Sequence, residues 1–227
     1  LFKRWTFFGM FTSHSRVHGF PPREPWEFSD EFLKVFRKMV EMRYRLMPYI
    51  IAQAALAANN GWPMLKAMFF NYPDDPTTWN IEDQFMFGDD MLVAPIMEEN
   101  TNSRNVYLPK GKWIDYQTKK VYDGAQWITI KTGELPGIVL IKNGSVIPHI
   151  ALVQSTAVMN WTKIELVVFS DGIEDCKGYF YQPGKKLSEV VVQNNIGKWE
   201  ISSFPNGSFR RAFTDKKVAF SVRGFDE

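Results

Sequence analysis

The sequence predicts a mixed fold, in which the last β/α unit of a (β/α)8 barrel is followed by two all-β sandwich domains. A long helical pattern covers residues 29–60, short strand-like segments replace it from residue 62, and the strands become more polar after residue 148. These changes of pattern divide the chain into a barrel end (1–61), a proximal β-sandwich (62–148) and a distal β-sandwich (149–227).

The composition is that of an ordinary globular protein and excludes several functional classes. The 227 residues are 45% hydrophobic and 23% charged, which suffices for a core and one to two domains. A net charge of +2 does not indicate the strongly basic surface that binds nucleic acid. No apolar run approaches the about 20 residues of a membrane span, and no signal peptide is visible. We therefore expect a cytoplasmic protein without nucleic-acid or membrane partners, although Asn-x-Ser/Thr triplets at Asn143, Asn160 and Asn206 leave secretion open.

The first 11 residues predict the end of a helix whose start lies outside the chain. Their apolar residues fall near one helical face, with Lys3 and Arg4 off it. Residues 12–18 alternate loosely and predict a short buried strand that ends at His18-Gly19. Prolines at 21, 22 and 25 then exclude regular structure, because they remove backbone donors and fix φ.

Residues 29–60 form the clearest helical pattern. Ser29 or Asp30 is expected to cap it, and apolar residues repeat at three- and four-residue steps. Pro48 interrupts the hydrogen-bond ladder, which predicts a kink or a break near Arg45. An Asn-Asn-Gly stop signal follows at the end of the pattern.

From residue 62 the period becomes strand-like, and turns rich in Gly, Pro, Asn and Asp separate the segments. In the proximal sandwich we expect a strand within residues 64–72, two within 84–95, and others at 105–108, 113–116, 127–131, 138–141 and 145–147. The last two flank Asn143-Gly144, a strong hairpin signal. In the distal sandwich we expect strands at 164–169, 177–181, 188–193, 198–203, 209–213 and 218–222.

Residues 10–26 are the stretch whose composition indicates a site. It holds two histidines, two arginines and a tryptophan, namely His14, His18, Arg16, Arg23 and Trp26. The two histidines are four positions apart, but the glutamate of an HExxH motif is missing, and the third histidine of the chain lies in the β region. Since a zinc site needs at least three protein ligands, we expect no metal and no other cofactor.

The adjacent carboxylate pairs do not predict catalysis. They stand at residues 74–75, 89–90 and 98–99, and neighbouring side chains of a strand point to opposite faces. Turn chemistry explains them better, since the carboxylates of a glycosidase must face each other across the scissile bond. No G-x-S-x-G elbow occurs, and the acidic neighbours of Cys176 disfavour its thiolate. These side chains therefore give no sign of a nucleophile or of a catalytic pair of acids.

Two interpretations of Arg16 and His18 remain open on these grounds. In the structural interpretation, the arginine pairs with a carboxylate and the histidine bonds to the backbone. In the functional interpretation, a short strand, a proline-rich loop and a long helix form the last β/α unit of a barrel. The carboxyl end of such a strand, where His18 stands, faces the substrate.

Several separate motifs follow one another over roughly the first two thirds of the chain. They are FGMFTSHSRVHG with REPW, then RYRLMPYI, PMLKAMFFNYPDDP, DQFMFGDDMLVAPI and VYLPKGKWIDYQTKKVYDG. In order and spacing they resemble glycoside hydrolase family 31, the retaining α-glucosidases and α-xylosidases. The tail from residue 150 matches only as an expected distal β-sandwich.

The resemblance implies a barrel enzyme of which this chain is the C-terminal part. The two catalytic aspartates of the family lie upstream, in W-x-D-M-N-E and W-x-G-D motifs that are absent from this chain. The chain opens with Leu1 and is expected to begin in the helix before the last barrel strand. Its implied partners are the N-terminal remainder of the enzyme and an oligosaccharide or α-glycoside substrate. Assembly into a homo-oligomer is left open.

The resemblance also assigns roles to the residues of the loop. His18 is the family histidine that follows the S-R-x step, and it is expected to bind sugar hydroxyls in the −1 subsite. Ser15 and Arg16 receive support roles, and Arg23 and Trp26 are expected to position the following loop. SHSRVHG is similar to the α-xylosidase form, whereas α-glucosidases carry bulkier FSRNH-like strings. We therefore expect hydrolysis of terminal α-linked xylose, with α-glucosidase activity as the alternative.

A function of another class is a non-catalytic β-sandwich module that binds carbohydrate or a partner protein through exposed aromatic residues. The aromatic fraction of 15% suits either a core or sugar stacking. If the chain is only part of a barrel, its first helices should expose an apolar patch. We expect this patch at Phe2, Trp5, Phe7, Phe8, Phe32 and Phe36.

Overall fold

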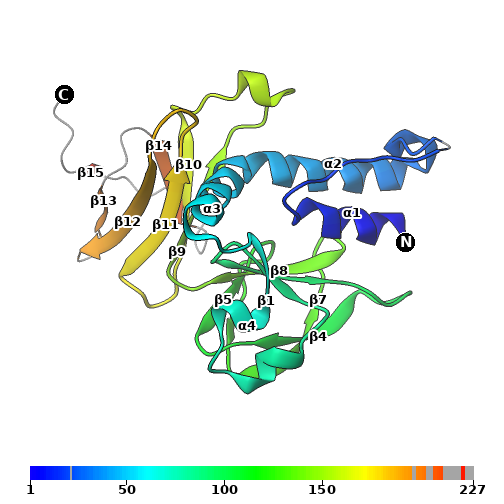
Figure 1. The fold of residues 1–227 in the computed structure, drawn as a ribbon, viewed down its shortest axis with the longest axis horizontal. Coiled ribbons are helices and arrows are strands. Elements are labelled where there is room, and N and C mark those ends of the chain that lie inside the picture. Colours follow the sequence, from blue (N-terminus) through cyan, green and yellow to red (C-terminus); the bar gives the residue numbers. More distant parts are fainter. Residues whose placement is uncertain (21, 196–197, 203–206, 212–220, 223–227) are drawn as a thin grey trace.

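The computed structural model describes residues 1–20, 22–195, 198–202, 207–211 and 221–222. Its longer helices are α1 (Phe2–Met10), α2 (Asp30–Arg45) and α3 (Met47–Asn60), and two large sheets and a two-stranded ribbon follow them in the chain (Figure 1). α1 and α2 share a core with the first sheet, whereas α3 packs mainly on the second. Within these described ranges, no helix is long and apolar enough to cross a membrane.

The helix predicted at the start of the chain is confirmed as α1, but the strand predicted at residues 12–18 is wrong. The segment is irregular and is exposed from Ser13 onward. A strand needs a neighbour for its backbone N–H and C=O groups. No strand in the described part of the chain pairs with this segment. The loose alternation of its residues is therefore not enough to make it a strand.

The long helical pattern is confirmed, together with its predicted break. Ser29 Oγ accepts a hydrogen bond from the Phe32 N–H at 3.1 Å and caps α2. The break falls at Leu46, so that Pro48 lies in the first turn of α3, where no intrahelical donor is needed. α3 ends at Gly61, whose φ of 73° lies in the left-handed region.

The first sheet has the strand order β1-β2-β3-β8-β5-β6. Its strands are β1 (Leu65–Ala67), β2 (Phe85–Phe87), β3 (Met91–Pro95), β5 (Lys112–Asp115), β6 (Val121–Asp123) and β8 (Gly137–Lys142). A separate ribbon of β4 (Ser103–Leu108) and β7 (Gln126–Lys131) shares a buried core with this sheet. The predicted strands are confirmed except within residues 64–72, where β1 gives way to the short helix α4 (Met68–Asn71).

The second sheet has the order β14-β10-β9-β11-β12-β13-β15 among the described residues. Its strands are β9 (Ser145–Ile150), β10 (Ile164–Phe169), β11 (Asp175–Tyr181), β12 (Leu187–Asn195), β13 (Lys198–Ser202), β14 (Gly207–Arg211) and β15 (Ser221–Val222). They confirm the strands predicted between residues 164 and 202. Parts of the strands predicted at 209–213 and 218–222, and the triplet at Asn206, lie outside the described residues.

The hairpin predicted at Asn143-Gly144 is wrong. β8, which precedes it, belongs to the first sheet, and β9, which follows it, belongs to the second. Asn143 instead exchanges two hydrogen bonds with the backbone of Asp171: its Nδ2 donates to the carbonyl oxygen at 2.9 Å, and its Oδ1 accepts from the N–H at 2.7 Å. The chain therefore passes from one sheet to the other here, and the boundary predicted after residue 148 falls inside β9.

The predicted apolar patch on α1 and α2 is only partly exposed. Trp5 is 67% exposed, as expected, but Phe7 is fully buried. A Cβ on Gly137 would lie 2.1 Å from the Phe7 ring, so this glycine makes room for it. Phe2 and Phe32 are half-buried and stack with 5.0 Å between ring centroids. Phe8 and Phe36 are half-buried as well.

The turn between β2 and β3 is bonded to α3 and to the start of β9. Tyr49 Oη donates to the carbonyl oxygen of Phe87 at 2.9 Å, and the Asp90 N–H donates to Tyr49 Oη at 3.3 Å. Ser145 Oγ donates to Asp90 Oδ1 at 2.8 Å. Burial raises the pKa of the Asp90 carboxyl to about 6, although the hydrogen bond from Ser145 acts in the opposite direction. The junction therefore holds a carboxylate whose charged form is disfavoured.

We predict that Asp90→Asn removes a pH-dependent cost to stability. The pKa of about 6 in the folded state exceeds the ordinary value of 3.8, so the folded state binds more protons than the unfolded state between these values. The stabilisation that the protonated Asp90 carboxyl gives the folded state is complete below pH 3.8, and it is lost as the pH rises through 6. Above this window we expect asparagine, which keeps an acceptor for Ser145, to raise the free energy of unfolding by about 1–3 kcal/mol.

Urea unfolding of both proteins on either side of this pH window measures the effect. The difference between them should shrink to near zero on the acidic side. A difference that does not depend on pH would contradict the assignment of the titration to Asp90.

Candidate functional site

The residues predicted to form the site lie on the exposed segment between α1 and α2 (Figure 1). Ser15, Arg16, His18 and Arg23 are exposed, and Trp26, in the short helix η1 (Pro25–Glu27), is 64% exposed. Trp26 lines a cavity of about 560 Å³ with residues of α2 and of the loop after β9, but the other four do not line it. The structure thus places the five residues between α1 and α2 without gathering them around that cavity.

Ser15 and Arg23 lie against the backbone of glycines. A Cβ on Gly9 would lie 3.2 Å from Ser15 Oγ, and a Cβ on Gly19 would lie 2.8 Å from Arg23 Nε. Ser15 therefore covers the end of α1, while Arg23 folds back onto Gly19. These positions suit residues that support or position the loop.

Arg16 and His18 have no comparable contacts. Within the described ranges, no hydrogen bond or ion pair joins either side chain to another group. The structural interpretation, an arginine paired with a carboxylate and a histidine bonded to the backbone, is therefore not what the described residues show. Both side chains remain available to a ligand or to another part of the protein.

Arg43 anchors the start of the loop, a role not predicted from the sequence. Its guanidinium donates to the carbonyl oxygens of Met10, of Thr12 at 2.9 Å and of Ser13 at 3.2 Å. Burial lowers the pKa of the Arg43 guanidinium, which nevertheless stays charged. One signal was present: Arg43 stands four residues after the buried Met39, which places an arginine on the core-facing side of α2.

The other polar candidates occupy structural positions. His149 is buried in β9, where its Nε2 lies 2.8 Å from Tyr116 Oη and its Nδ1 lies 2.9 Å from a backbone carbonyl oxygen. Asp75 Oδ1 accepts from the Thr77 N–H at the start of the short helix η2 (Pro76–Asn80), and its Oδ2 accepts from Tyr107 Oη at 2.7 Å. In the part of the chain that the structure describes, no three His, Cys, Asp or Glu side chains are grouped to hold a metal.

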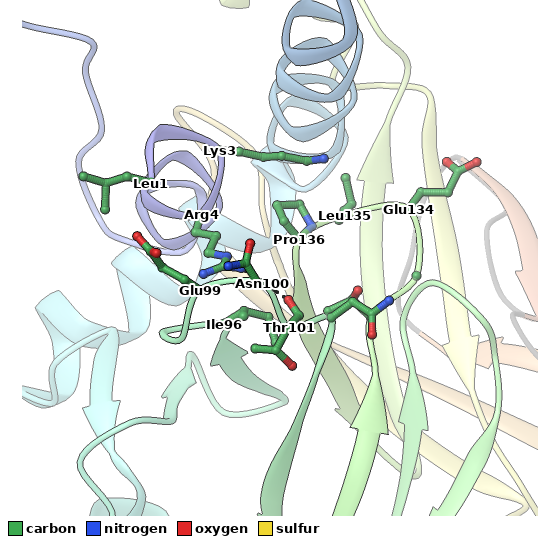
Figure 2. Close-up of a pocket in the computed structure, with 13 residues that line it drawn as sticks. Leu1, Lys3, Arg4, Ile96, Glu99, Asn100, Thr101, Glu134, Leu135 and Pro136 are labelled. Atoms are coloured by element: carbon green, nitrogen blue, oxygen red, sulfur yellow. Dashed lines mark hydrogen bonds between the residues drawn. The ribbon is translucent and has the colours of Figure 1, made fainter.

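A cavity of about 470 Å³ separates the start of α1 from two loops of the proximal β region (Figure 2). Leu1, Lys3 and Arg4 line one side, and residues of the loops at 96–102 and 132–136 line the other. Arg4 extends toward the first loop (Figure 2), where it donates to the carbonyl oxygens of Glu98 and, at 3.3 Å, of Thr101. No predicted site residue lines this cavity, which belongs to the junction between α1 and these loops.

Two models of one protein family match the chain in sequence order. Residues 1–53 match the TIM-barrel domain of the glycosyl hydrolases of family 31, and residues 61–147 match the C-terminal domain of the same family. The first match ends within α3, and the second runs from Gly61 into β9. The transition from helices to strands therefore coincides with the transition between the two matches.

Relatives with assigned names align over most of the chain. Alpha-glucosidase 2 of Bacillus thermoamyloliquefaciens is 38% identical over 98% of this chain, and an alpha-xylosidase of Lactiplantibacillus pentosus is 35% identical over 89%. The chain spans only 29% and 27% of the lengths of these two relatives.

Solved structures resemble the chain over a similar extent. A family 31 dextranase of Flavobacterium johnsoniae, in complex with isomaltotriose, has a TM-score of 0.79 at 30% identity and covers 88% of this chain with 26% of its own. A family 31 alpha-xylosidase of Xanthomonas citri has a TM-score of 0.79 at 25% identity and covers 96% of this chain with 27% of its own. On these matches of sequence and structure, the chain belongs to glycoside hydrolase family 31.

Proposed function

We propose that the complete protein is a retaining α-glycosidase and that this chain is its C-terminal part. The reaction is hydrolysis of terminal α-linked xylose, or of glucose in the alternative, from oligosaccharides or glycosides. The observation that carries the proposal is the order of the family matches, with a barrel domain at residues 1–53 followed by a C-terminal domain at 61–147. Relatives named alpha-glucosidase and alpha-xylosidase support it.

In this proposal His18 forms one wall of the −1 sugar site. Its exposed ring has no partner within the described residues, so its two nitrogens can donate to and accept from sugar hydroxyls. Ser15 and Arg16 support the loop, and Arg23 and Trp26 position its continuation. Retention needs one carboxylate as nucleophile and a second as acid and then base, and both aspartates belong to the N-terminal remainder of the enzyme. His18 supplies binding that strengthens as the sugar becomes oxocarbenium-like.

We also propose that the β region forms two sandwich domains behind the barrel end. Two separate core clusters support this division: one contains Leu92 and Trp113, and the other contains Leu166 and Trp199. The boundary between them then moves from residue 148 to Asn143-Gly144, where the chain changes sheet. α1, α2 and α3 would complete the barrel with the N-terminal remainder. The cytoplasmic location stays a prediction, and assembly into a homo-oligomer stays open.

A paired-substrate assay of the complete enzyme tests the reaction. We expect hydrolysis of aryl α-xyloside and aryl α-glucoside with the higher kcat/KM on the xyloside, because the SHSRVHG loop resembles the α-xylosidase form. Proton NMR should show the α-anomer of the sugar as the first product. A clear preference for the glucoside would overturn the xylose assignment. Hydrolysis of neither substrate would overturn the reaction and favour a non-catalytic binding module.

A further inference from the structure

The structure describes two of the three Asn-x-Ser/Thr triplets of the chain, those at Asn143 and Asn160. The third, at Asn206, begins outside the described residues. Such a triplet accepts an N-linked oligosaccharide on the side-chain nitrogen Nδ2 of its asparagine. The folded chain can therefore use a triplet only where this nitrogen is exposed and is not engaged in a hydrogen bond that holds the fold.

The triplet at Asn143 does not meet these requirements. Asn143 is half-buried, and its Nδ2 donates to the carbonyl oxygen of Asp171 at 2.9 Å. The third residue of the triplet, Ser145, is buried, and its Oγ donates to Asp90 Oδ1 at 2.8 Å. Both polar side chains of this triplet serve the junction between the two sheets. A transferase would have to break these hydrogen bonds to reach the asparagine.

The triplet at Asn160 lies in the loop that joins β9 to β10, between the short helix η3 (Thr156–Val158) and β10 (Figure 1). Asn160 and Thr162 are both exposed. Between them, Trp161 is half-buried and packs against the core cluster of the second sheet, and the preceding Met159 is buried in that cluster. Apolar neighbours therefore fix the loop to the core, while the two polar residues of the triplet stay in solvent.

The side chains of Asn160 and Thr162 are bonded to each other. Thr162 Oγ1 donates to Asn160 Oδ1 at 2.6 Å, and the Thr162 N–H donates to the same oxygen at 3.0 Å. Because a backbone N–H needs an acceptor, this contact fixes which end of the carboxamide is the oxygen. Nδ2 has no hydrogen-bond partner among the described residues. The atom that would carry a glycan is therefore free, and the hydroxyl that defines the triplet lies beside it.

We propose that Asn160 is the residue at which the folded chain accepts an N-linked oligosaccharide. The donor class is an oligosaccharide joined through C1 of its reducing-end sugar to a polyprenyl diphosphate. Nδ2 forms a bond to C1, the bond from C1 to the diphosphate oxygen breaks, polyprenyl diphosphate leaves, and the proton lost by Nδ2 passes to solvent. Use of the site in a cell requires export, which the triplets leave open. The assignment does not depend on the proposed hydrolysis.

Transfer to the folded protein tests the assignment. The purified complete enzyme is incubated with an oligosaccharyltransferase and a polyprenyl-diphosphate oligosaccharide, and peptide mass spectrometry locates the modified asparagines. We expect a glycan on Asn160 and none on Asn143, because only the first has a free and exposed Nδ2. Any other pattern at these two positions of the folded enzyme, including modification of both or of neither, overturns the proposal.

Two peptides, of residues 140–147 and 157–164, are the matched control. We expect the transferase to modify both of them, since neither peptide is held in the fold. A peptide of residues 140–147 that is not modified would assign the difference to the sequence around Asn143 and overturn the structural argument.

Asn160→Asp separates an acceptor from a residue that only shapes the turn. The variant keeps Oδ1 for the two donors of Thr162 but has no Nδ2. It should therefore lose the modification at this position, while its thermal unfolding temperature stays close to that of the wild type. Thr162→Ala should lose the modification as well, whereas Thr162→Ser should keep it. A glycan on Asn160 that survives in Thr162→Ala would overturn the role of the triplet.

Discussion

Replacing Gly88 by alanine is expected to lower the free energy of unfolding by about 2–5 kcal/mol, the sum of a left-handed backbone cost and an overpacking cost. Gly88 has a φ of +68°, and a Cβ there would lie 2.3 Å from Tyr49 Oη and 2.7 Å from Gln53 Cδ. Both residues are buried on α3, so neither can move away without disturbing the contact between the helix and the first sheet. Urea unfolding of the variant measures the loss.

Gly61→Ala is the matched control for this effect. Gly61 has a φ of +73°, but nothing lies within 4 Å of a Cβ built there. Its replacement should therefore cost only the left-handed backbone term, about 1–2 kcal/mol. Equal losses in the two variants would show that the packing of Gly88 against α3 contributes nothing, and that the turn is held by its backbone alone.

Replacing Arg43 by alanine is expected to lower the free energy of unfolding by about 2–4 kcal/mol, because one charged donor serves several carbonyl oxygens. The carbonyls of Met10, Thr12 and Ser13 would lose this partner together. They lie at the end of α1 and at the start of the loop that carries His18. The variant should therefore also show faster amide hydrogen exchange in residues 10–14, and denaturant unfolding gives the loss in stability.

Arg45→Ala provides the comparison for Arg43→Ala. Arg45 is an exposed arginine in the same last turn of α2. Its loss removes an equal charge from the helix end without touching the loop carbonyls. A loss of stability in Arg45→Ala as large as that in Arg43→Ala would assign the effect to the charge at the helix end rather than to the loop.

The helices and most strands could be predicted from the sequence because their signals are local. Ser29 caps α2 through its own side chain, Pro48 sets the break, and Gly61 adopts the left-handed conformation that ends α3. These features depend on residues within one turn of the chain.

The errors arose where a distant partner decides the structure. Residues 12–18 alternate like a strand, but the described chain supplies no neighbouring strand for them. Asn143-Gly144 has the composition of a hairpin, yet Asp171, 28 residues later, binds the asparagine, and each flanking strand finds its partners elsewhere. The residues next to a turn do not show whether the strands on its two sides pair with each other or with distant strands.

The sequence predicts which loop carries the proposed site, but not how its side chains are arranged. His18 was predicted through its motif and its place before a proline-rich segment, and its role stays a proposal. Arg43 was missed because it lies on a helix whose apolar pattern hides it, and only the fold shows which backbone groups it meets.

The kcat/KM of His18→Ala in the complete enzyme tests the central claim most directly, that this loop forms one wall of the −1 sugar site. His14→Ala is the control, since His14 stands on the same exposed loop and its Nδ1 lies 3.0 Å from its neighbour Ser13. We predict that His18→Ala loses about 1–3 kcal/mol of transition-state stabilisation, the range for a lost polar partner. His14→Ala should stay close to the wild type. An unchanged kcat/KM in His18→Ala would remove His18 from the site and contradict the account.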